Sequence, residues 1–252
     1  GLSAAEKERM TAYGADMSKY LDSGNEARIK KAYESRDPRL QMAVITPYAQ
    51  YNGASSGIAH TYTLRWPYRG SDSAEPFDIR TDTNDKFYYL WRKFVPEGLE
   101  QTERDTYGLD IPLIRYAEVL LLKAEALNEW GSTHESEAIR CVNEVRRRAG
   151  HVELNNATYP ATKVNGQSDL RERIRNEYYW EIGGEDSMYF HELRWGTWKD
   201  KKFDNNRNGL MQMWGETTYT WYWLGDQCWS WPIPAKEMEM NSNLEQNEGW
   251  IN

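Results

Sequence analysis

Apolar residues recur at steps of three and four between residues 109 and 129, a spacing that places them along one face of an α-helix. These positions are Leu113, Ala117, Leu120, Leu121, Ala124 and Leu127. A second stripe follows, made of Ala138, Cys141, Val142, Val145 and Ala149. Gly131 and Gly150 come directly after the two stripes, and glycine suits the C-terminal end of a helix. The sequence therefore predicts an antiparallel pair of amphipathic helices.

A third helix is predicted to begin near Ser168 or Asp169, where Glu172 is placed for a capping box, and to end at Gly183 and Gly184. Its inner face should carry Leu170, Ile174, Tyr178 and Glu181.

Two further features support a mainly α-helical chain. Ala126 and Ala138 lie twelve residues apart, which fits the small-residue spacing of one degenerate tetratricopeptide repeat. A short helix should follow Pro234, because proline is tolerated in the first turn of a helix.

The segment from residue 43 to 105 has no helical periodicity and is rich in Gly, Ser, Pro and Tyr, so we expect loops with short strands there. Residues 217–233 alternate around Gly225 and Asp226, a pair that accepts the backbone of a tight turn, which predicts a β-hairpin. Its two faces would carry Trp221 and Trp223 with Cys228 and Ser230, and Tyr222 with Trp229.

Charge and composition exclude some classes of function. The net charge of -8 disfavours nucleic acid, because phosphate backbones are held by clustered Lys and Arg. The longest aliphatic run, Val119 to Leu122, is far shorter than the roughly 20 residues of a membrane helix. The two cysteines define no disulfide framework. The first residues lack an export signal, so we expect any such signal to lie upstream or to have been removed.

Ordered short motifs run along nearly the whole chain. They are Arg36-Asp37-Pro38-Arg39-Leu40, Tyr89-Leu90-Trp91-Arg92-Lys93-Phe94, the run from Ile111 to Leu121, Ala124-Glu125-Ala126, the run from Val142 to Gly150, Ile174-Arg175-Asn176-Glu177 continuing to Tyr189-Phe190 and Leu193-Arg194-Trp195-Gly196, and Trp231-Pro232-Ile233-Pro234 with Glu237 and Gln246-Asn247-Glu248-Gly249-Trp250. Together they resemble the C-terminal portion of the SusD-like (RagB/SusD) family.

The resemblance implies a mainly α fold of tetratricopeptide-like helix pairs, with a large loop-rich region and short β-hairpins. It implies a non-catalytic receptor without cofactors, which binds oligosaccharide or polysaccharide during nutrient uptake and delivers it to a SusC-like TonB-dependent transporter. Such a protein is a surface-exposed lipoprotein of the outer membrane, attached only through a lipid anchor that would lie outside this chain. Residues 1–252 would be one domain, a C-terminal region that pairs with the N-terminal half of the same protein.

One stretch departs from the family pattern. Residues 185–191 read Glu-Asp-Ser-Met-Tyr-Phe-His, where the family has an acidic-glycine pair before an Arg-Tyr-Phe-Asp run. Because a glycine, an arginine and an aspartate of the pattern are missing here, the resemblance does not define the ion pairs of this stretch.

Catalytic and metal-binding readings have little support in the sequence. No nucleophile elbow, Walker loop, dinucleotide fingerprint or zinc motif occurs. Glu177, Glu181 and Glu185 stand at steps of four and are the basis of the alternative that the chain is a glycoside hydrolase. We expect them instead to form structural ion pairs, with Arg171, Arg173 or Arg175 as partners.

Two other groups of polar and charged residues are expected to have structural roles. Residues 204–209 match half of a calcium loop, but position twelve is Gly215, which favours a turn. The charged residues where the resemblance is densest should maintain the fold, namely Arg115, Glu118, Glu125, Arg146, Arg148 and Arg175.

Sugar rings stack on aromatic faces while their hydroxyls bond to Arg, Asp and Asn, and the chain has 12 Trp and 17 Tyr against 5 Phe. The loop segment offers both kinds of group, so its candidates for carbohydrate binding are Tyr51, Tyr62, Arg65, Trp66, Tyr68, Arg69 and Asp72, with Tyr48 and His60 nearby. Trp221 and Trp223 are further candidates, whereas Trp229 and Trp231 are expected in the core. An equal alternative for Trp66 is that it does not bind sugar but fills a hydrophobic core beneath the loop.

A purely structural, transporter-associated role is the third reading of the chain. Separately, the interpretation of the chain as a C-terminal portion predicts that helix faces bearing Leu120, Ala124, Val142 and Val145 meet partners that are partly absent from this chain.

Overall fold

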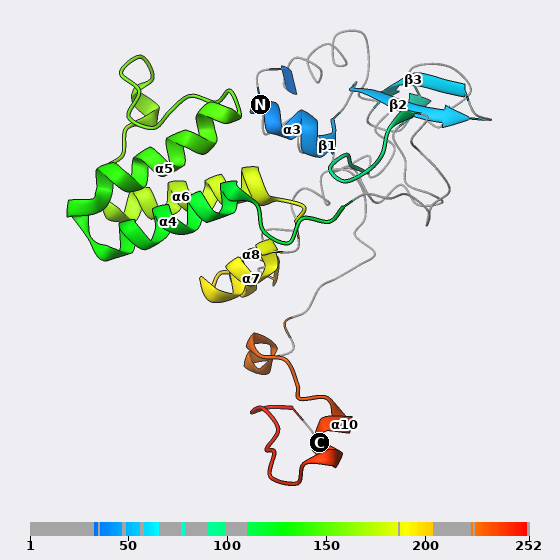
Figure 1. Ribbon diagram of the computed structural model, residues 1–252, viewed down its shortest axis with the longest axis vertical. Helices are drawn as coiled ribbons and strands as arrows, with labels where there is room; N and C mark the ends of the chain where they lie inside the picture. Colours follow the sequence, from blue (N-terminus) through cyan, green and yellow to red (C-terminus); the bar gives the residue numbers. More distant parts are fainter. Residues whose placement is uncertain are drawn as a thin grey trace, which may run out of the picture.

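The computed structural model describes residues 33–34, 36–46, 49–55, 58–65, 77–78, 90–98, 110–185, 187–203, 223 and 225–250. Three helices form the centre of the molecule: α4 (Tyr116–Trp130), α5 (Glu135–Arg148) and α6 (Gln167–Ile182). The short 3-10 helices η3 (Ser132–His134) and η4 (Pro160–Thr162) lie in the connections. Figure 1 shows α4 and α5 side by side with α6 packed against them, which confirms the predicted helix pair.

The core lies between these three helices. Its fully buried side chains include Leu121, Ala124, Ala138, Val142, Val145, Leu170, Ile174, Tyr178 and Ile182. Each belongs to one of the apolar stripes or adjoins it, so the periodicity located the core correctly. Burying a Val, Leu or Ile side chain contributes about 1.5–3 kcal/mol to stability relative to leaving it exposed.

Two details of the helix boundaries were wrong. The first helix begins at Tyr116 and not at residue 109, because Arg115 is extended (φ -109°, ψ 152°) and Leu113 is 88% exposed. The third helix begins after Gly166 and has no side-chain cap. The Asp169 carboxylate accepts from the backbone N of Asn165 instead, and Glu172 pairs with Arg175, so no capping box forms.

The expectation that these helix faces meet partners absent from the chain was also wrong. Leu120, Ala124, Val142 and Val145 are already buried among α4, α5 and α6. The apolar side chains that remain exposed on α4 belong to its outer face, at Tyr116, Val119, Leu122 and Trp130.

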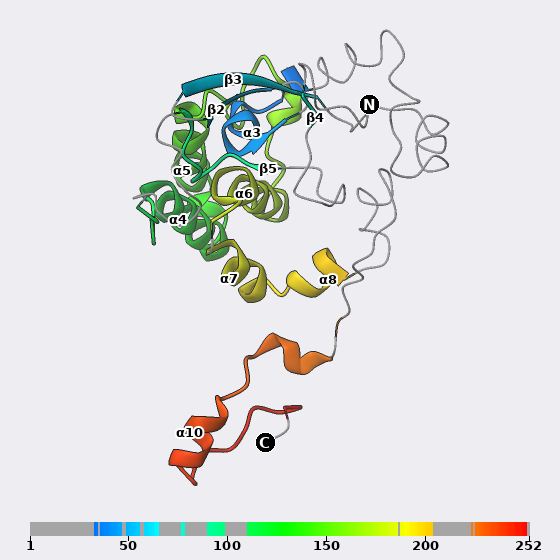
Figure 2. The same cartoon turned by 90° about the vertical axis from the view of Figure 1, so that its right-hand side faces the viewer.

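The loop-rich part contains short elements, as predicted. These are α3 (Pro38–Ala43), β1 (Val44–Ile45), β2 (Gln50–Ser55), β3 (Ile58–Arg65), β4 (Phe77–Asp78) and β5 (Leu90–Trp91). Strands β2 and β3 form an antiparallel hairpin, and β4 pairs with β3 in parallel. Strand β5 pairs with β1, which holds residues 90–98 beside the end of α6 (Figure 2).

The C-terminal part begins with α7 (Ser187–Arg194) and α8 (Trp198–Phe203) and ends with η5 (Asp226–Trp229) and α10 (Ala235–Met240). The helix after Pro234 is confirmed. The hairpin prediction is wrong for the residues that can be compared, because Asp226–Trp229 form a 3-10 turn that begins at Gly225 (φ 136°). A turn with bonds three residues apart leaves no alternating strand there.

Side chains, and not strand pairing, hold the tail together. The amide of Gln246 accepts from the backbone N of Ile233 (2.7 Å) and donates to its carbonyl (2.9 Å). Asn247 donates to the carbonyl of Trp231, and the Trp250 indole donates to the carbonyls of Gln227 and Ser230. The expectation that Trp231 is a core residue is wrong, since 70% of it is exposed.

In the ranges that the structure covers, no helix combines the length and the apolar character needed to cross a bilayer.

Candidate functional site

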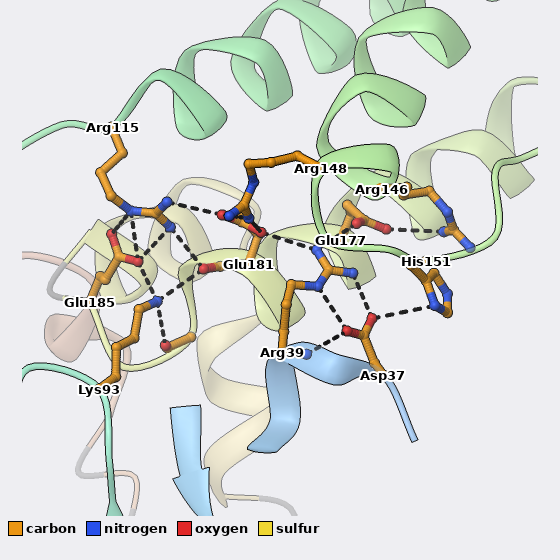
Figure 3. A network of polar contacts seen from close by, with 11 residues as sticks. Asp37, Arg39, Lys93, Arg115, Arg146, Arg148, His151, Glu177, Glu181 and Glu185 are labelled. Atoms are coloured by element: carbon orange, nitrogen blue, oxygen red, sulfur yellow. Dashed lines mark hydrogen bonds and ion pairs between the residues drawn. The ribbon is translucent and has the colours of Figure 1, made fainter. Parts of the chain in front are cut away.

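Two of the three glutamates spaced four apart, Glu177 and Glu181, sit on the face of α6 that meets α3 and α5 (Figure 3). The third, Glu185, follows the end of α6 and faces the loop after β5. Glu177 has no exposed surface, and its carboxylate receives Arg39 Nη1 at 2.8 Å and Arg146 Nη1 at 3.0 Å. Burial raises the pKa of Glu177, because low dielectric disfavours its charged form and the two guanidinium groups offset this only in part.

Glu181 is the centre of the cluster. Its carboxylate contacts Arg39 (3.1 Å), Arg115 (2.9 Å) and Arg148 (2.5 Å), while only 2% of its side chain is exposed. Arg39 thereby connects α3 to two successive turns of α6. Its own position is fixed by Asp37, which caps α3 through Arg39 N and also binds the guanidinium Nη2 at 2.6 Å.

Glu185 completes the row beyond the end of α6. Arg115 donates to it from Nη2 at 2.7 Å, and Lys93 forms a second ion pair with it. Lys93 also donates to the carbonyls of Glu181 and Gly183, groups that the end of a helix leaves without intrahelical partners. The network therefore joins four segments of chain around one helix.

This geometry removes the basis of the glycosidase alternative. A glycosidase needs two carboxyl groups that face a cleft and reach the sugar, one of them available to donate a proton. Glu177 and Glu181 are instead buried against arginines, and Glu185 is paired with Arg115 and Lys93. The expectation of structural ion pairs is confirmed.

The expected partners of these glutamates were wrong. Arg171 pairs with Glu129, Arg173 with Asp169 and Arg175 with Glu172. Since the glutamates point inward toward α3 and α5, arginines on the outer faces of the same helix cannot reach them. The actual partners Arg39 and Lys93 lie inside two of the ordered motifs, which was the only sequence signal for them.

The other charged residues that were expected to maintain the fold, Glu118, Glu125 and Arg175, also stabilise the helix packing. Glu118 receives His191 Nε2 at 2.8 Å, and both side chains are buried. Glu125 binds Arg194 and the Trp195 indole, and the Arg175 guanidinium lies 5.3 Å from the centre of that indole.

Only part of the predicted carbohydrate site is described. Tyr51 on β2 and Tyr62 on β3 are direct cross-strand partners in the hairpin, and Tyr51 is half-buried. Arg65 ends β3, opposite Asp78 of β4, and His60 lies in the same strand. Tyr48, Trp66, Tyr68, Arg69, Asp72 and Trp221 lie outside the described residues.

Trp223 is placed next to Trp229, with ring centroids 5.0 Å apart. Its indole N donates to Asp226 (3.3 Å), and Lys199 lies 5.4 Å from the ring centre. Both tryptophans are half-buried, so Trp229 is not the fully buried core residue that was expected.

The residues of the proposed calcium turn, 204–209, lie outside the described part. Within that part no group of three His, Cys, Asp or Glu side chains could hold a metal ion.

The helix pair, the loop-rich sheet region and the ionic cluster define a tetratricopeptide-like, mainly helical protein with no glycosidase carboxylates on α6. The chain belongs to the SusD family, whose family model matches residues 10–250. The resemblance seen in the motifs is thus confirmed. Members of this family are non-catalytic glycan-binding proteins, so the expectation of a non-enzyme is confirmed at the level of the family.

Individual relatives agree with this assignment. SusD-like protein P38 of Formosa agariphila is 32% identical over 139 residues, which are 55% of this chain and 24% of that protein. The starch-binding protein SusD of Bacteroides thetaiotaomicron is 28% identical over 161 residues, 64% of this chain and 25% of that protein. A solved SusD-like structure from Bacteroides fragilis superposes with a TM-score of 0.57 at 22% identity, over 87% of this chain and 40% of the other.

The matched regions thus span about a quarter of the length of the two relatives. The structural likeness supports the fold alone.

Proposed function

We propose that this chain is part of a non-catalytic receptor that captures oligosaccharide or polysaccharide at the outer membrane surface. The match of the SusD family model to residues 10–250 is the observation that carries the proposal. One relative is named as a starch-binding protein, which supports a glucan as one candidate ligand among several classes of glycan.

In this proposal the ligand contacts the aromatic loop segment, with Tyr51, Tyr62, Arg65, Trp66, Tyr68, Arg69 and Asp72 as the contact residues. The backbone register supports it, because it makes Tyr51 and Tyr62 direct cross-strand neighbours in one hairpin. Trp221 and Trp223 form a second candidate contact, where Asp226 and Lys199 provide polar groups beside the Trp223 ring.

The bound glycan would pass to a SusC-like TonB-dependent transporter. The receptor would be a lipoprotein, attached to the membrane by a lipid anchor outside this chain. Residues 1–252 would act as one SusD-like C-terminal region together with the N-terminal half of the same protein. The exposed apolar face of α4 supports such a contact, because Tyr116, Val119 and Trp130 are 47–75% exposed along one side of the helix.

Isothermal titration calorimetry tests the proposal directly. The chain is titrated with hexasaccharides of maltose, cellulose, xylan, mannan and galacturonan type, and the proposal expects saturable binding of at least one. The same ligand should lose affinity for Trp66→Ala while circular dichroism stays unchanged. Absence of binding across the panel, in a chain that is folded, would refute glycan capture by this chain.

The structural alternative makes a different prediction. If this chain only contacts a partner, changes on the outer face of α4, such as Val119→Asp, should abolish association with the N-terminal half. Under this alternative, no glycan should bind the assembled protein through residues 48–72 or 221–223.

A further inference from the structure

A half-exposed tryptophan that was not among the predicted contact residues lies on the last turns of α6. Trp180 is 45% exposed, although it directly precedes the buried Glu181. The His151 imidazole meets the indole ring edge-on, with centroids 5.8 Å apart and planes at 68°. The Arg146 guanidinium carbon lies 5.9 Å from the ring centre. Periodicity gave no signal for this cluster, because the apolar stripe of α6 lies on its inner face.

The local backbone fixes His151. Helix α5 ends in a Schellman motif, in which Gly150 (φ 70°) donates to the carbonyl of Arg147 and His151 N donates to the carbonyl of Arg146 at 2.8 Å. This backbone bond fixes His151 two residues beyond the C-cap of α5, and 28% of its side chain is exposed.

Asp37 is the third member of the cluster, from the start of α3. Its Oδ2 lies 3.6 Å from His151 Nδ1 and binds Arg39 Nη2, while Oδ1 accepts from Arg39 N and Nε (Figure 3). Because Arg39 is itself clamped by Glu177 and Glu181, the carboxylate is held in one orientation. Three separate segments thus position an indole, an imidazole and a carboxylate on a rigid part of the fold.

These groups suit one class of ligand. A flat indole face binds the apolar face of a pyranose ring, while an imidazole and a carboxylate bind its hydroxyls. Burial lowers the pKa of His151, and Arg146 lowers it further, so the neutral ring can donate from one nitrogen and accept at the other. Asn176, exposed one helical turn before Trp180, adds an amide on the same side of α6.

We propose that Trp180, His151 and Asp37 form a carbohydrate subsite for one pyranose unit, made of residues other than those predicted in the aromatic loop segment. The inference rests on the proposed function, since it assigns a second place where the captured glycan contacts the chain. The outer face of α4 differs from this cluster in exposing several large apolar side chains, Tyr116, Val119, Leu122 and Trp130, as is usual for protein contacts. The Trp180 indole is surrounded by polar side chains, which favours a sugar over a protein.

The test compares two tryptophan–histidine pairs of the same chain. Trp130 stacks on His134 with centroids 4.2 Å apart and is 75% exposed, but none of the ion pairs or hydrogen bonds described places a carboxylate beside it. Trp180→Ala, Trp180→Tyr, His151→Ala and Trp130→Ala are titrated with whichever hexasaccharide of the panel binds the parent. Circular dichroism and urea unfolding establish that each variant is folded.

We expect Trp180→Ala to weaken binding about three- to tenfold, the loss of one stacking contact. His151→Ala should weaken it less, whereas Trp180→Tyr and Trp130→Ala should bind like the parent. If Trp180→Ala unfolds the chain, the His151→Ala titration decides the question alone. Parent-like affinity in both Trp180→Ala and His151→Ala would overturn the subsite while leaving glycan capture intact.

Two other results would also refute the subsite. If no hexasaccharide binds the parent, the proposed function fails and the subsite fails with it. If Trp180→Ala keeps its sugar affinity but changes the oligomeric state in size-exclusion chromatography, the surface is a protein contact and the subsite is refuted.

Discussion

Arg39 Nη1 lies 2.8 Å from Glu177 Oε1, although 138 residues separate the two in the chain. The contact joins α3 of the loop-rich part to the middle of α6. Because Glu177 is completely buried and also holds Arg146, the stability of two different parts of the molecule depends on one carboxylate.

Replacing Glu177 by Gln should therefore be strongly destabilising. The change leaves Arg146 without its buried counter-charge and removes one of the three carboxylates that hold Arg39. Breaking a buried ion pair on one side costs about 3–5 kcal/mol. Urea unfolding measures the loss. Glu137→Gln is the control, because Glu137 pairs with Lys123 on the surface, where solvent screens an ion pair and its loss changes stability little. Similar losses in the two variants would contradict a special role for the buried pair.

Stability should fall in acid through Glu185. Burial alone would raise the pKa of this carboxyl, but Arg115 and Lys93 outweigh it and hold the pKa below its ordinary value. An unfolded Glu titrates near 4.3. The folded pKa is lower, so the unfolded chain binds more protons, and the contribution of Glu185 is complete above about pH 4.3 and is lost as the pH falls through the folded pKa.

Urea midpoints between pH 3 and 7 check this prediction. The parent should lose more stability below about pH 4.3 than Glu185→Gln does, since the variant has no carboxyl to protonate at that position. Parallel curves for the two proteins would show that Glu185 does not contribute.

Gly184→Ala should destabilise more than Gly196→Ala. Both glycines have positive φ, 83° and 67°, so both substitutions strain the backbone. At Gly184 a Cβ would also lie 2.7 Å from the Trp91 ring, whereas at Gly196 it would meet nothing within 4 Å. We expect about 1 kcal/mol for Gly196→Ala and clearly more for Gly184→Ala. Equal thermal midpoints would mean that Trp91 moves aside without cost.

Trp231→Ala should cost less than about 1 kcal/mol, because the side chain is 70% exposed and its one described hydrogen bond goes to the Tyr189 hydroxyl at 3.2 Å. A loss of 3–5 kcal/mol in urea unfolding, the range for a buried aromatic, would restore the expectation that Trp231 is a core residue.

The helical core could be predicted from the sequence, because Leu121, Val142 and Ile174 are repeated at the helical period and their burial follows from that period alone. For the ionic cluster, the sequence predicted that the glutamates form structural ion pairs, but not which residues are their partners. Glu177 and Glu181 are visible on one face of α6, but Arg39 comes from a segment whose position depends on the tertiary fold.

The hairpin failed for a related reason. Alternation around Gly225 is compatible with a strand, yet the turn at Asp226–Trp229 is held by bonds from Trp250, which no local pattern contains. The same limit applies to Trp180 and His151, whose proximity depends on the ends of two different helices.

The Gln246 amide has a consequence for self-association. Pro232 and Pro234 have no N–H, so the peptide N–H of Ile233 is the one donor between the two prolines, and Gln246 already occupies it together with the carbonyl of the same residue. An extended segment whose edge groups are engaged in this way cannot serve as a template for a strand of another molecule. The tail is thereby protected against edge-to-edge aggregation, and a Gln246→Ala chain should lose that protection.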